Sequence, residues 1–143
     1  MTVARNDPGT IFLGGDHTQV GDLAASATIK PGHLIERFNS AGVIRWRVAT
    51  TDIAGPPAVA LNQSMLNKGV DDTYAVGDLV EASIGHKGAA YWMLVASGQT
   101  VVAGALLGSA GDGTLKTSPT VARFTALENK TAVALTRIRV EVL

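Results

Sequence analysis

The chain has 143 residues, 12 basic and 12 acidic, with a formal net charge of zero and no cysteine. The length suits one domain of ordinary size, and the absence of cysteine excludes disulfides, thiolate metal sites and cysteine nucleophiles. Neither half of the chain is strongly basic or acidic, so the sequence shows no basic face or tail of the kind that holds nucleic-acid phosphates, and no nucleic-acid partner is expected. Aromatic residues are only 5% of the chain, so small aliphatic side chains must fill the core.

The first 25 residues are predicted to form an N-terminal arm, followed by a single domain over 26–143. They contain no apolar run typical of a signal peptide, and no segment approaches the ~20 apolar residues of a membrane span. We therefore expect no membrane partner and folding in the cytoplasm. Ile11, Phe12 and Leu13 stand together among glycine and polar residues. The segment is either a disordered tail with one edge strand or an arm that lies across a partner.

Apolar and polar residues alternate in several later segments, and this period of two is typical of half-buried strands in antiparallel sheets. Residues 43–48 place Ile44, Trp46 and Val48 on one face and two arginines on the other. The same alternation occurs at 121–126, where Phe124 is the expected anchor, and at 137–142. Only residues 61–67 suggest a helix, of one or two turns. The pattern predicts an all-β fold, a small antiparallel β-barrel or sandwich.

A weak repeat marks three corners of this structure. Each copy is a small or cyclic residue, a glycine, a variable residue and two aliphatic residues, and the glycines are Gly32, Gly77 and Gly104. A glycine that adopts positive φ can turn the chain into a strand there. Spacings of 45 and 27 residues are too uneven for a solenoid, so the repeat indicates one barrel that uses the same corner three times.

Five glycines between 98 and 113 suggest a phosphate-binding loop, but the required pattern is absent. A P-loop needs G-x-x-x-x-G-K-[ST], and the residues after Gly108 are serine and alanine. Asp112 between Gly111 and Gly113 lacks the further oxygen ligands of a calcium loop. These three residues are instead predicted to form the tight turn of a hairpin.

Other candidate catalytic groups do not converge in the sequence. Asp71 and Asp72 are adjacent carboxylates, but their surroundings indicate a solvated turn. The histidines at 17, 33 and 86 lack zinc-site spacing, and no G-x-S-x-G motif surrounds the serines at 97, 109 and 118. We expect no catalytic residue, no metal and no cofactor, and therefore no enzyme. A hydrolase built from Asp71, Asp72 and a histidine is the weaker alternative.

The segment from Tyr91 to Val95 is apolar at every position. A monomeric barrel would bury only one face of this strand, so the other face is predicted to meet another subunit. This assigns Tyr91, Trp92 and Met93 to an interface between subunits.

Several segments together resemble the capsid decoration, or cement, proteins of tailed double-stranded DNA bacteriophages. The most specific are GVDDTYAVGD at 69–78 and ASGQTVVAG at 96–104. Weaker matches lie at 59–61, 109–115, 126–128 and 138–142, so the resemblance covers about two thirds of the chain. It implies β-barrel-like subunits that form trimers on the outer capsid surface, across seams between major capsid protein subunits.

From this resemblance we expect a structural virion protein, made in the host cytoplasm, whose partners are the major capsid protein and itself. The apolar triplet Ile11, Phe12 and Leu13 is the expected capsid-binding part of the arm. A carbohydrate- or ligand-binding β module on the virion surface remains the alternative.

Overall fold

The computed structural model describes residues 7–50 and 57–143, and the described chain is almost entirely β-structure. The sequence-based prediction of a small all-β barrel is confirmed. The only helical element described is a 3-10 turn, η1 (Ser64–Leu66), within the predicted 61–67 segment. Thirteen strands follow one another along the described residues: β1 (Phe12–Gly14), β2 (His17–Val20), β3 (Leu34–Ser40), β4 (Val43–Val48), β5 (Ala58–Ala60), β6 (Ala82–Gly85), β7 (Ala90–Val95), β8 (Thr100–Val101), β9 (Leu106–Ser109), β10 (Leu115–Thr117), β11 (Phe124–Ala126), β12 (Lys130–Thr131) and β13 (Thr136–Val142).

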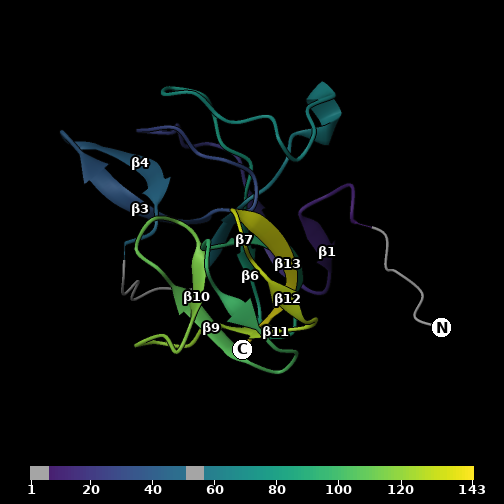
Figure 1. Ribbon diagram of the computed structural model, residues 1–143. Helices are drawn as coiled ribbons and strands as arrows, with labels where there is room; N and C mark the ends of the chain where they lie inside the picture. Colours follow the sequence, from purple (N-terminus) through teal and green to yellow (C-terminus); the bar gives the residue numbers. More distant parts are fainter. Residues whose placement is uncertain (1–6, 51–56) are drawn as a thin grey trace.

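Five strands close into a barrel in the order β7-β10-β9-β11-β13, with β13 returning to β7 (Figure 1). Neighbouring strands are antiparallel except β10 and β7, which meet in parallel where Leu115 lies opposite Val95. Strands β9 and β10 form the predicted hairpin around the Gly111-Asp112-Gly113 turn. Side chains from all five strands fill one buried cluster, with Phe124 fully buried in it.

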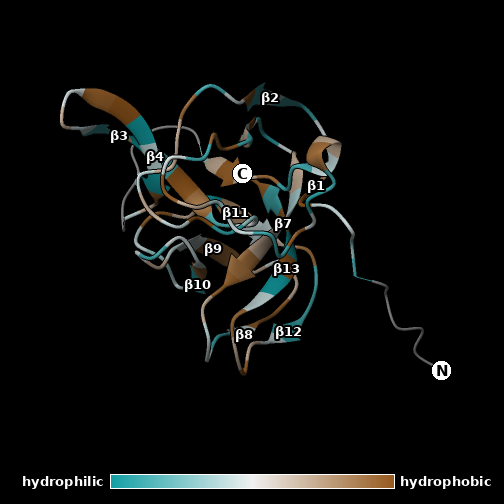
Figure 2. Cartoon of the chain, turned by 90° about the horizontal axis from the view of Figure 1, so that it is seen from above, coloured by the Kyte–Doolittle hydropathy of each residue, from teal (hydrophilic) through white to brown (hydrophobic). Residues whose placement is uncertain are grey.

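A second sheet has the order β2-β6-β5-β3-β4, and its side chains form a smaller buried cluster around Trp46. At its edge the β3–β4 hairpin projects away from the barrel in both views (Figures 1 and 2). A separate two-stranded sheet pairs β8 with β12.

The N-terminal segment belongs to the folded domain, which corrects the expected division after residue 25. Strand β1 pairs with β7, and β2 pairs with β6 along its full length. Ile11 is fully buried in the barrel cluster, and its carbonyl accepts a hydrogen bond from Trp92 N–H at 2.8 Å. Phe12 and Leu13 are half-buried against the same cluster. The triplet is therefore core and edge strand, and residues 1–6 lie outside the described chain.

Strand β7 is buried on both faces within one chain, contrary to the trimer interface predicted for Tyr91, Trp92 and Met93. Tyr91 and Met93 lie opposite Val140 and Ile138 of β13 and belong to the barrel cluster. On the other face the Arg137 guanidinium covers the Trp92 ring at 5.2 Å. These side chains fill the subunit's own core and are not available to a neighbouring subunit.

The outer half of the β3–β4 hairpin differs from the expected burial. Ile44 shares a face with Trp46 as the alternation predicts, yet Trp46 is buried and 48% of Ile44 is exposed. The reason is the projection of the hairpin, because nothing in the described chain covers its tip. The hairpin turns through Ala41 and Gly42, both with positive φ, the combination of a type I′ turn.

All five glycines predicted at turns adopt positive φ. Gly32, Gly77 and Gly104 have φ values of 94°, 90° and 89°, and Gly111 and Gly113 have values of 96° and 85°. Only glycine adopts this region without strain, so the three similar sequence segments correspond to similar backbone corners.

Candidate functional site

The GVDDTYAVGD segment forms two capped turns on the surface. The Asp72 carboxylate accepts a hydrogen bond from Gly69 N–H at 2.6 Å, and the Asp78 carboxylate accepts one from Ala75 N–H at 2.9 Å. Both aspartates are solvent-exposed. Each carboxylate thus closes a turn over three residues, which is the usual use of aspartate in loops.

Tyr74 anchors this segment to the body of the protein. Its buried hydroxyl donates to the Leu61 carbonyl at 2.5 Å and accepts from Glu81 N–H at 3.3 Å. Burial raises the pKa of Tyr74 to about 12, so the hydroxyl stays protonated as the donor that Leu61 requires.

Asp71 is held by Arg137, which joins three distant segments. The Arg137 guanidinium donates to Asp71 at 3.1 Å, to the Pro31 carbonyl at 3.0 and 3.3 Å, and to the Val70 carbonyl. The Arg137 side chain is only 8% exposed. Asp71 is therefore one partner of a structural clamp, and the two adjacent aspartates have separate structural partners.

The second resemblance segment, ASGQTVVAG, is also structural. The Gln99 side-chain carbonyl accepts hydrogen bonds from the backbone N–H and the hydroxyl of Thr117, at 3.0 and 2.8 Å. Gly98 turns the chain with φ 87°, and Val101 is buried in the barrel cluster. Both motifs that carry the family resemblance thus maintain the fold.

His33 lies beside the Gly111–Gly113 hairpin, with its ring next to Gly113. Burial lowers the pKa of His33 to about 4, against a smaller opposing effect of Asp112. Neutral His33 accepts a hydrogen bond from Lys30 N–H at its Nδ1. The pKa of Asp112 is lowered chiefly by the hydrogen bond from the Thr114 hydroxyl. No group of three metal-ligating side chains occurs within residues 7–50 and 57–143.

A serine and a histidine do meet, a contact that no sequence motif predicted. His17 Nδ1 lies 2.5 Å from the Ser83 hydroxyl, which lies 2.6 Å from the Tyr91 hydroxyl. Ser83 and Tyr91 are both fully buried, so a substrate cannot reach the serine. The His17 imidazole and the hydroxyls of Ser83 and Tyr91 thus provide one another with hydrogen-bond partners between the two sheets. Of the serines weighed in the sequence, Ser109 instead donates to the Thr50 carbonyl.

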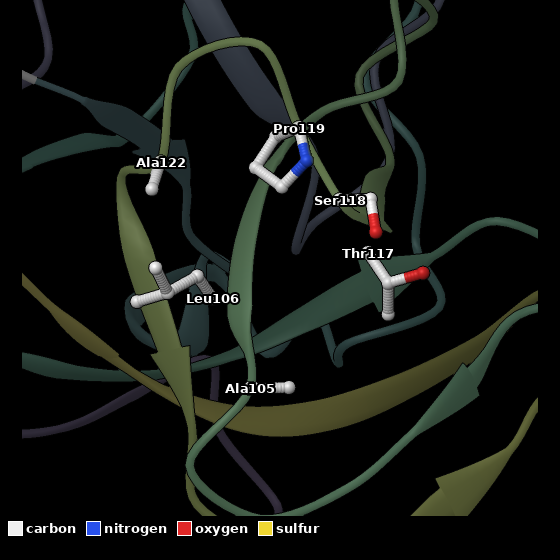
Figure 3. Close-up of a pocket in the computed structure, with 6 residues that line it drawn as sticks. All are labelled: Ala105, Leu106, Thr117, Ser118, Pro119 and Ala122. Atoms are coloured by element: carbon white, nitrogen blue, oxygen red, sulfur yellow. The ribbon is translucent and has the colours of Figure 1, made fainter.

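A shallow depression of about 410 Å³ lies beside β9, and Figure 3 shows the six side chains that line it. They are small, apolar or hydroxyl-bearing, and none is titratable near neutral pH: Ala105, Leu106, Thr117, Ser118, Pro119 and Ala122. The depression therefore lacks the acid, base or activated nucleophile that an enzyme site would need.

Aromatic side chains, the usual contacts of sugar-binding modules, are not displayed on this protein. All seven lie within the described residues, and none is fully exposed. Phe12 and Phe38 are half-buried and the other five are buried.

The exposed groups that do gather are aliphatic. Val43 and Ile44 form the tip of the β3–β4 hairpin, and Val76 and Leu79 lie in the loop that precedes β6. Met65 on η1 is 96% exposed. Such side chains are typical of surfaces that bind other proteins. None of the helices in the described chain is long and apolar enough to cross a membrane.

Comparison with known proteins identifies a similar fold but no sequence family. No family model and no curated protein matches the chain. The chain is similar in fold to the N base of the head fiber gp8.5 of bacteriophage phi29. That crystal structure aligns with a TM-score of 0.56 and 15% sequence identity, over 90% of this chain and 98% of the other. The likeness therefore extends over nearly the whole of both structures.

Proposed function

We propose that this chain is a structural protein of a phage head that binds the outside of the assembled capsid as a trimer. In this role it cements neighbouring major capsid protein subunits against the pressure of packaged DNA. The observation that carries the proposal is the fold likeness to a head fiber base, which spans almost the entire length of both chains. The resemblance of the segments at 69–78 and 96–104 to capsid decoration proteins is the ground for proposing the cementing role in particular.

The surface fits an interaction protein and gives no support to an enzyme. Exposed aliphatic side chains lie on a projecting hairpin and on loops, while the adjacent carboxylates of Asp71 and Asp72 have structural partners. The buried aromatic residues give no support to the alternative of a carbohydrate-binding module. We accordingly propose a non-enzymatic protein without cofactor.

The energetic basis of cementing is mass action. A protein that binds the assembled shell but not its separated subunits stabilises the shell by RT ln(1 + [L]/Kd) for each site, about 2.7 kcal/mol at a hundredfold excess over Kd. Three linked copies bind more tightly than one, because the first contact raises the effective concentration of the others.

The test is the heat stability of undecorated shells with and without the purified protein. We expect added protein to raise the temperature at which shells disassemble, with a saturating effect. Serum albumin at equal concentration is the control for non-specific protection. An unchanged disassembly temperature at saturating protein would contradict cementing.

A further inference from the structure

Two surfaces of the chain are complementary in charge and in apolar content. One is the basic hairpin, residues 34–48, which holds three arginines and one glutamate, a net charge of +2. The other is the acidic loop, residues 67–81, which holds one lysine and four acidic residues, a net charge of −3. The whole chain has no net charge, so these two segments concentrate opposite signs.

The charges on both surfaces are largely unpaired within the chain. Glu36 pairs with Arg47 at 2.9 Å, which leaves Arg37 and Arg45 without an ion pair among the described residues. Arg45 Nε is also buried without a hydrogen-bond partner. Arg37 lies over the Trp46 ring at 5.1 Å, so its guanidinium is oriented before any partner arrives.

In the acidic loop, Asp71 belongs to the Arg137 clamp, while three acids have no ion pair within the described chain. Asp72 and Asp78 accept backbone hydrogen bonds, and Glu81 accepts one from Gln19. These hydrogen-bond donors are neutral groups, so none of these contacts places a cation beside the three carboxylates. Their charge is available to a cation from another molecule.

The apolar groups recur at the same spacing on both surfaces. In the hairpin, Val43 is followed two residues later by Arg45. In the loop, Val76 and Leu79 are each followed two residues later by an acid, Asp78 and Glu81. The three aliphatic side chains are more than half exposed. In β4 this spacing places Val43 and Arg45 on the same face, and in the loop each acid follows an exposed aliphatic residue closely in the sequence, so both surfaces combine aliphatic side chains with charges of opposite sign.

The geometry prevents the two surfaces from meeting fully within one chain. Residues 24–26 lie between them, since Trp46 N–H donates to the Ala24 carbonyl and Ala25 N–H donates to the Asp78 carbonyl. The hairpin continues beyond this contact into solvent (Figures 1 and 2). Its tip therefore reaches past its own loop.

We infer that the hairpin binds a second copy of this chain, so that the basic hairpin of one copy packs against the acidic loop of the next. Two different surfaces joined head to tail form a closed ring when the rotation between copies closes. Opposite charges set the register and speed association, while burial of the aliphatic side chains stabilises it. This inference rests on the proposed function only for the number of copies, three.

Charge reversal tests the contact by solution mass, without capsids. We expect the wild type to have three times the 14.8 kDa chain mass. Arg37→Glu with Arg45→Glu is expected to weaken association at least about tenfold, as is Asp72→Lys with Asp78→Lys. Combining all four changes in one chain restores the assembly. The control, Lys87→Glu on an exposed turn, leaves the mass unchanged.

Disulfide trapping gives a second, independent measurement, because the chain has no cysteine of its own. A chain with Ile44→Cys is mixed with a differently tagged chain with Val76→Cys and oxidised gently. We expect crosslinks between the two tags. Crosslinks only between identical chains, or a wild-type monomer at micromolar concentration, would overturn the inference.

The two proposals fail in different ways. If the reversed hairpin loses shell binding while the wild-type protein is a monomer, the hairpin binds the capsid and the self-contact is wrong. If the ring forms and responds to charge reversal but no shell is bound, the self-contact stands and the cementing function fails.

Discussion

The Arg137 guanidinium lies 3.1 Å from the carboxylate of Asp71, although 66 residues separate them in the sequence. The two contribute unequally to stability, because the Arg137 side chain is 8% exposed and the Asp71 side chain 77% exposed. The buried partner also binds two backbone carbonyls, whereas the exposed carboxylate is solvated.

Arg137→Met is therefore expected to lower the free energy of unfolding by about 3 kcal/mol, since it leaves the Pro31 and Val70 carbonyls unsatisfied. Asp71→Asn is expected to cost less than about 1 kcal/mol. Urea unfolding of both variants measures the difference. Equal losses would show that the ion pair, and not the carbonyl contacts, makes the clamp.

Ile11→Ala is expected to lower the free energy of unfolding by about 2–5 kcal/mol, because Ile11 is fully buried in the barrel cluster. Deletion of residues 1–20 removes β1 and β2 as well and is expected to unfold the chain at 37 °C. The half-buried Leu13→Ala is the matched control, with a smaller loss. Thermal unfolding by circular dichroism measures all three. A truncated chain with native stability would restore the picture of a separate arm.

His33 makes stability depend on pH. Its pKa falls from 6.5 to about 4 on folding, so folding favours the neutral form. The stabilisation is complete above pH 6.5 and is lost as pH falls towards 4, roughly 2 kcal/mol by pH 5. His33→Gln removes this contribution, so the variant has a flatter dependence between pH 7.5 and 5. Urea unfolding of both proteins at the two pH values measures this dependence. An equal loss of unfolding free energy in the wild type and the variant would contradict the role of His33.

Two glycines of β9 and its preceding turn are expected to resist substitution for different reasons. A Cβ added at Gly108 would lie 2.3 Å from the Val121 carbonyl oxygen. A Cβ added at Gly104 would have no neighbouring atom within 4 Å. Gly104→Ala meets only the strain of positive φ, about 1 kcal/mol, while Gly108→Ala is expected to cost several times more. Melting temperatures distinguish the two, and similar losses would contradict the steric argument.

Local pattern predicted the strands and corners well, because a period of two and the positive φ of glycine are properties of short segments. It did not predict the covering of Trp92 by Arg137, a contact between residues 45 apart on paired strands. Without this contact, the apolar pattern of β7 predicts a second subunit on its outer face. Alternation at Ile44 and Trp46 gave their common face correctly, but burial depends on where the hairpin lies relative to the body.

The sequence suggested one edge strand at most in the N-terminal segment, whereas the structure has two strands there, both paired with strands of the folded domain. Residues 11–20 show neither regular alternation nor a repeated corner, and their strands form only by pairing with β7 and β6. Their stability comes from long-range partners, which single-sequence patterns do not contain. The Ser83 contact with His17 likewise depends on that pairing.

The most direct test of the central claim is co-sedimentation of the purified protein with undecorated phage shells, beside the same capsid protein in disassembled form. The proposed function predicts saturable binding at a fixed ratio to the shell's capsid protein, with little binding to separated subunits. Absence of saturable binding, or equal binding to disassembled subunits, would contradict a protein that cements the assembled head.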